Sequence, residues 1–137
     1  MPRVKKRSVV IYGRGRSSEF AAPDGAIVIR LKRDPKPCDV RVGRSVIFQG
    51  KEPFWHFNDP PKWIDYYRRF SSRKPSTGLC AVFLASEKLN IGTLYLAGFD
   101  NLLDGVPIPG HDMRAELEAL NSLGLNIVDA RECGAVR

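Results

Sequence analysis

The architecture of this chain follows from one segment, Pro75-Ser76-Thr77-Gly78-Leu79-Cys80-Ala81-Val82-Phe83-Leu84-Ala85, which leads into Leu94-Tyr95-Leu96-Ala97-Gly98-Phe99-Asp100. Pro75 pushes the residue before it out of the helical region, and Ser76 or Thr77 can serve as the N-cap of a new helix. The nearly continuous apolar run predicts a helix from Ser76 to about Asn90 that is buried on most of its faces. A buried strand from Thr93 to Ala97 follows it.

The entrance of this helix is a candidate anion site. Gly78 has no side chain to cover the N–H groups of the first turn, so a phosphate could approach the backbone and the positive end of the helix dipole. Gly98 and Phe99 come directly after the strand, at its carboxyl end. Phosphorylated ligands bind at this edge of parallel sheets. We therefore expect the helix entrance and the Gly98 turn to belong to one site.

Length and composition indicate one ordinary globular domain covering residues 1–137. Hydrophobic residues make up 43% of the chain and charged residues 27%. No apolar run approaches the roughly 20 residues that cross a bilayer, and the basic segment Met1–Arg7 leads into too short an apolar run for a signal peptide. The three cysteines are far apart and lack metal-site spacing, which favours a reducing cytoplasm and predicts no metal centre.

The net charge of +7 is unevenly distributed. Residues 1–74 hold 18 Lys and Arg against 7 Asp and Glu, whereas residues 75–137 hold 4 against 8. A basic half favours anionic partners such as nucleotides, phosphorylated glycans, an anionic polymer such as nucleic acid, or an anionic membrane. A solvated basic face that binds nothing is the competing interpretation.

Alternating strands and helices predict the fold class. Ser8–Tyr12 is a continuous apolar run that is typical of a central parallel strand. The remaining predicted strands are 26–31, 45–48, 93–97 and 126–128, and helices are predicted at 62–70, 76–90 and 113–123. The aromatic and proline-rich segment 53–61 reads as a loop over a pocket mouth or as an anchor on the sheet. This order predicts an α/β fold, a Rossmann-like three-layer sandwich with a mostly parallel sheet of about five strands.

Two further segments are candidates for phosphate contact. The turn Gly13-Arg14-Gly15 follows the first strand and resembles the first turn of dinucleotide-binding folds, although a tight strand-to-helix turn would use the same glycines. Arg30 and Lys32 lie at the end of the second predicted strand, where α/β sheets bind anions. A solvated loop explains these two cations equally well.

His111 is the candidate proton acceptor. It precedes a predicted helix that Asp112 would cap, and Glu116 lies five residues on, where it could support the imidazole. An imidazole exchanges protons near neutral pH, so a histidine at a helix entrance suits general base catalysis. The alternative is a surface histidine beside a helix cap.

Four segments, in the right order, resemble sialyltransferases of glycosyltransferase family 29 and, more distantly, family 42. The first two resemble the long sialylmotif of that family, the third the small sialylmotif, and the fourth the very small motif. The Pro-Ser-Thr-Gly to Gly-Phe unit is the most specific of them. They are, in chain order, Val10–Gly15 with Val28–Pro35, Asp39–Arg44, Pro75–Leu79 through Leu94–Phe99, and His111 with Glu116.

The resemblance implies an inverting, metal-independent glycosyltransferase. A sugar would pass from a nucleotide-activated donor, CMP-linked by resemblance, to an acceptor hydroxyl such as that of a glycan. His111 would take the acceptor proton, and Glu116 would stand beside it. The expected donor contacts are Gly13, Arg14, Gly15, Arg30, Lys32, Ser76, Thr77, Gly78, Gly98 and Phe99.

The chain also departs from the family pattern. Arg14 and Lys32 stand where the family has asparagines that contact the nucleotide, and no histidine lies between Gly98 and Gly110. The cations favour a more anionic ligand, or arginines that supply phosphate contacts. Two other functions therefore stay open, a non-catalytic nucleotide- or phosphate-binding module of the same fold and a nucleic-acid-binding protein that uses the basic half.

Overall fold

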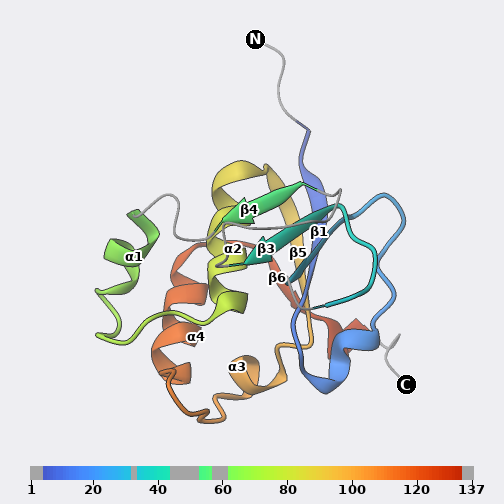
Figure 1. Cartoon of the computed structure of the whole chain (residues 1–137). Coiled ribbons are helices and arrows are strands. Elements are labelled where there is room, and N and C mark those ends of the chain that lie inside the picture. The colour runs from blue at the N-terminus through green and yellow to red at the C-terminus, as the bar shows by residue number, and fades with distance from the viewer. Residues whose placement is uncertain (1–4, 32–33, 44–52, 57–61, 134–137) are drawn as a thin grey trace.

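The computed structural model describes residues 5–31, 34–43, 53–56 and 62–133, and these residues build one six-stranded parallel sheet (Figure 1). The strand order is β4-β3-β2-β1-β5-β6, and each neighbouring pair is parallel. The strands are β1 (Arg7–Tyr12), β2 (Ile27–Leu31), β3 (Val40–Gly43), β4 (Phe54–His56), β5 (Ile91–Ala97) and β6 (Ile127–Asp129). The predicted α/β, Rossmann-like class is confirmed, with six strands where about five were expected.

The chain reverses its direction across the sheet beside β1. It first proceeds outward from β1 to β4, then returns through α1 (Lys62–Tyr67) and α2 (Thr77–Lys88) to place β5 on the other side of β1. Loops that leave β1 and β5 therefore diverge at the carboxyl edge of the sheet. Such a switch point is where open α/β sheets form their ligand crevice.

The two faces of the sheet are covered differently. Figure 1 shows α1, α2 and α4 (Met113–Ser122) on one face, above the larger apolar core. The opposite face is covered by the 3-10 helices η1 (Arg16–Glu19) and η2 (Ala130–Cys133) and by the chain after η1. Side chains of β1 alternate between the two cores, with Val9 and Ile11 in the larger and Val10 and Tyr12 in the smaller.

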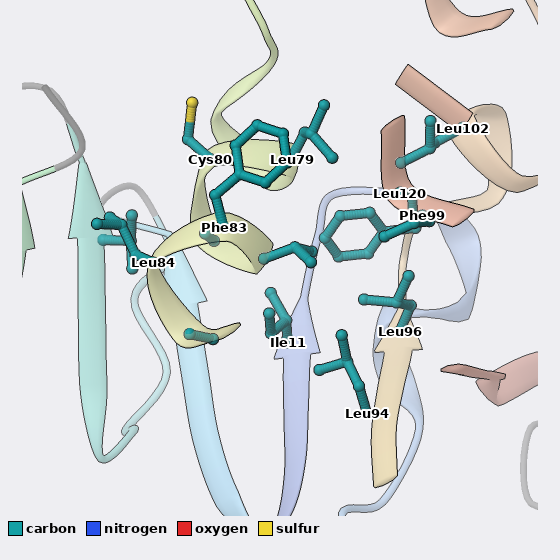
Figure 2. Packing of buried hydrophobic residues seen from close by; sticks show 14 of the residues in the cluster. Ile11, Leu79, Cys80, Phe83, Leu84, Leu94, Leu96, Phe99, Leu102 and Leu120 are labelled. Atoms are coloured by element: carbon teal, nitrogen blue, oxygen red, sulfur yellow. The ribbon is translucent and has the colours of Figure 1, made fainter. Parts of the chain in front are cut away.

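Helix α2 is the centre of the larger core, as the sequence predicts. Residues 79–85 are all buried, and Figure 2 shows Leu79, Phe83 and Leu84 of α2 in one packed cluster that also contains Ile11 of β1 and Leu94 and Leu96 of β5. The Phe83 ring stacks on Trp63 of α1 with centroids 4.9 Å apart. Burial on all sides fixes the position of the helix entrance, because any shift of α2 would open voids in a close-packed interior.

The predicted elements need correction along one edge of the sheet. The predicted strand 45–48 lies outside the described residues, whereas β3 and β4 were not predicted. Segment 53–61 was open to two interpretations, a loop over a pocket mouth or an anchor on the sheet. Residues 54–56 form β4, which pairs with β3 from Arg41 to Gly43, so this part of the segment belongs to the sheet. These strands have only four and three residues, and β3 buries Arg41, so their hydrophobic pattern is too short and too mixed to identify them.

Candidate functional site

A cavity of about 750 Å³ opens at the carboxyl edge of the sheet, at the switch point. It lies among the turn after β1, the ends of β2 and β3, the entrance of α2, the turn after β5 and the start of α4. Its walls are Gly13, Arg14, Gly15, Leu31, Val42, Gly43, Ser76, Thr77, Gly78, Gly98, Phe99, Asn101, Leu102, Ile108, His111 and Met113. Nine of these residues are among the twelve predicted for the site, and they come from segments far apart in the sequence.

The glycine turns after β1 and β5 are packed against each other. The N–H groups of Gly13 and Gly15 donate to the carbonyls of Ala97 and Gly98, each at 2.7 Å. A Cβ atom on Gly13 would lie 2.5 Å from the Gly98 carbonyl oxygen. The requirement for glycine at Gly13 thus comes from turn-to-turn packing, and these two amides are not available to a ligand.

A buried hydroxyl locks the same two turns together. The Ser17 Oγ atom accepts the Gly98 N–H at 2.7 Å and donates to Asp100 Oδ1 at 2.6 Å. Sequence reasoning missed both side chains. The available signal was a serine two residues after the Gly13–Gly15 turn and an aspartate directly after Gly98 and Phe99, but only the β1–β5 pairing brings them together.

The entrance of α2 leaves two backbone amides for a ligand. Ser76 is the N-cap and its Oγ accepts the Leu79 N–H, while the Ser76 hydroxyl and N–H both donate to the Glu116 carboxylate. The Ser76 hydroxyl is therefore engaged within the protein. Thr77 and Gly78 have N–H groups that make no hydrogen bond to the part of the chain that the structure describes. These amides point out of the first turn of a twelve-residue helix, where its dipole is positive.

His111 lies in the same cavity, just before α4. Asp112 caps that helix by accepting the Ala115 N–H at 3.1 Å, as predicted. The His111 Nδ1 atom is 3.3 Å from the Lys74 carbonyl oxygen and 3.7 Å from Glu116 Oε2. The carbonyl favours the tautomer with a proton on Nδ1, which leaves Nε2 as a proton acceptor.

Glu116 joins the helix entrance to the histidine. Its side chain is fully buried, and burial raises the pKa of the carboxyl, against the opposing effects of the Ser76 hydrogen bonds and the His111 imidazole. Glu116 and Asp112 also face Tyr67 of α1, where burial, followed by the nearby Glu116 charge, raises the pKa of the phenol. The sequence predicted Glu116 as a support for His111, and the structure gives it a second contact, with Ser76.

The raised pKa predicts how stability depends on pH. The folded chain holds the Glu116 proton more tightly than the unfolded chain, so the free energy of unfolding should fall as pH rises from about 4.5 through the folded pKa. Glu116→Gln should remove this slope, of up to about 1.4 kcal/mol per pH unit. Urea unfolding at a series of pH values measures it.

Glu118→Gln is the matched control, because Glu118 is exposed on the same helix. It should follow the wild-type pH profile. Parallel profiles for wild type and Glu116→Gln would contradict a raised pKa at this carboxyl.

The two other predicted cations, Arg30 and Lys32, are not among the described residues that line the larger cavity. Arg30 lines a second cavity of about 240 Å³ on the other side of Arg14. Its guanidinium bonds to Asp34 Oδ2 at 2.8 Å and to the Pro37 carbonyl at 3.0 Å. Lys32 lies outside the described residues. Arg30 is thus a neutralised cation in the structure and not a free phosphate ligand.

Comparisons with known proteins returned no relatives: no protein-family model, curated protein or solved structure matches this chain. Across the described ranges, no three His, Cys, Asp or Glu side chains gather as a metal-binding group. The helices of the same ranges are all too short or too polar to cross a bilayer. Functional inference therefore depends on the geometry of the cavity.

Proposed function

We propose that this chain is a glycosyltransferase that transfers a sugar from a nucleotide-activated donor to an acceptor hydroxyl. The observation that carries the proposal is that one cavity holds both the free amides of Thr77 and Gly78 and the imidazole of His111. The amides suit the phosphate of a leaving group, and the imidazole suits the proton of an attacking hydroxyl.

The proposed reaction is a single displacement. The acceptor oxygen forms a bond to the anomeric carbon of the sugar while the bond from that carbon to the donor phosphate oxygen breaks. The phosphate leaves with the bonding electron pair, and its negative charge is stabilised by the Thr77 and Gly78 N–H groups. The acceptor proton passes to Nε2 of His111. Because the acceptor oxygen attacks the anomeric carbon from the side opposite the leaving phosphate, the anomeric configuration inverts.

Glu116 is a positioning residue in this proposal. Its contacts with Ser76 hold the entrance of α2, and its oxygen 3.7 Å from Nδ1 stabilises the imidazolium that forms when His111 takes the proton. The family resemblance of the sialylmotif segments supports a CMP-linked donor. The wide spacing of the three cysteines in the sequence supports the proposed reducing cytoplasm.

Incubation with nucleotide sugars tests the proposal. CMP-, CDP- and UDP-linked sugars are mixed with a set of hydroxyl acceptors, and NMR records nucleotide release and the configuration of the product. We expect a product of inverted configuration from at least one donor. Tight nucleotide binding without product would instead assign the non-catalytic module. Nucleic-acid binding that weakens with salt, by a log–log slope of about −0.9 per phosphate contact, with no nucleotide binding, would assign the third function.

A further inference from the structure

Two cavities meet at the carboxyl ends of β1 and β2. The larger holds the Thr77 and Gly78 amides and His111, and the smaller lies beside Tyr12, Arg30 and the chain after β2. They share three wall residues, which are Gly13, Arg14 and Leu31. A ligand seated in the larger cavity therefore has Arg14 and the smaller cavity next to it.

One of the cations on the wall of the smaller cavity is already neutralised. Arg30 pairs with Asp34 and also lies over the Tyr12 ring, 4.0 Å from its centroid. Burial would raise the pKa of Asp34, but hydrogen bonds from the Lys36 N–H and Arg30 outweigh it and lower that pKa, so Asp34 stays ionised. Arg30 and Asp34 together contribute no net charge to the wall.

Arg14, unlike Arg30, is not neutralised by any of the residues that the structure describes. Its side chain is exposed, lines both cavities, and makes no hydrogen bond or ion pair to the residues that the structure describes. Lys36 is a second exposed cation on the wall of the smaller cavity, and Ser18 adds a hydroxyl there. The junction between the cavities is therefore positive, and a concave positive wall concentrates anions.

We propose that the ligand of this site carries two anionic groups, the second of which binds Arg14 at the junction of the two cavities. This inference rests on the proposed function, in which the first anion is the phosphate at Thr77 and Gly78. The second is either a further phosphate, as in a nucleoside diphosphate, or the carboxylate of an acidic sugar. Both offer paired oxygens that match the fork of a guanidinium.

Calorimetric titration of wild type and Arg14→Gln with CMP, CDP and CMP-sialic acid tests the inference. CMP has one anionic group, CDP adds a second phosphate, and CMP-sialic acid adds a carboxylate. We expect one of the two-anion ligands to bind wild type about tenfold more tightly than CMP, the scale of one charge-assisted hydrogen bond. In Arg14→Gln the two-anion ligand should bind no more tightly than CMP, and the ligand that loses its advantage identifies the anion.

Arg7→Gln is the matched control, because Arg7 is an exposed arginine at the opposite end of β1. It should bind all three ligands as wild type does. Equal weakening of CMP and the two-anion ligands by Arg14→Gln, or the same loss in Arg7→Gln, would overturn the inference.

The outcome separates this inference from the proposed function. Sugar transfer that does not depend on Arg14 would overturn the second anion site and leave the transferase standing. Tighter binding of a two-anion ligand that depends on Arg14, without any sugar transfer, would overturn the transferase and leave the second anion site standing. Failure of all three ligands to bind wild type would overturn both.

Discussion

Replacement of His111 by alanine is expected to slow sugar transfer by about 10² to 10⁴-fold, the usual contribution of a general base. His111 is the only group that accepts the proton of the attacking hydroxyl in the proposed reaction. Folding should be retained, because the imidazole is 27% exposed and lies on the wall of the cavity and not in the core. Initial rates of product formation and the free energy of unfolding measure the two effects.

Two further variants separate proton transfer from general damage. His111→Gln keeps a side-chain amide that can donate to the Lys74 carbonyl but cannot accept the acceptor proton, so it should be as slow as His111→Ala. Arg114→Ala, at an exposed position of the same helix, should react at the wild-type rate. A wild-type rate in His111→Ala would remove this residue from the mechanism.

Gly98→Ala is expected to have the largest effect on stability, a loss of about 3 kcal/mol or more. Gly98 has a φ of +77°, where a side chain is strained, and a Cβ atom there would lie 2.7 Å from the Gly13 carbonyl oxygen and 3.1 Å from the Gly15 nitrogen. Both neighbours are backbone atoms, so the two turns would have to move apart. Urea unfolding measures the loss.

Gly105→Ala isolates the contribution of this contact. Gly105 has a similar φ of +69°, but nothing lies within 4 Å of its Cβ position. It should lose only the cost of the left-handed conformation, about 1 to 2 kcal/mol. Equal losses in the two variants would show that the two turns are not closely packed.

The sequence was sufficient for the centre of the fold because that centre is made of long apolar runs. The run after Gly78 predicted α2, and Ser8–Tyr12 predicted β1, since each is continuous enough to exclude a solvated segment. The edge strands β3 and β4 depend on pairing with a neighbour. That pairing leaves no periodic pattern in segments of four and three residues.

The candidate site was predictable as a set of segments but not as a set of contacts. Glycines and a capping serine marked the turns, because backbone geometry requires those residue types locally. Which group each side chain meets is decided by tertiary packing. Ser76 lies in the cavity as expected, but its bond to Glu116 was not predicted, and the Ser17–Asp100 contact depends on strand register alone.

The pairing of β1 with β5 also determines when the cavity can form during folding. Gly13 and Gly98 face each other only after the intervening described chain has passed through four strands, β2 to β5, and the helices α1 and α2. Contacts this distant in sequence must overcome a large loop-closure entropy and form slowly. The cavity should therefore be among the last parts of the molecule to appear during refolding, so that recovery of ligand binding lags behind recovery of helical circular dichroism.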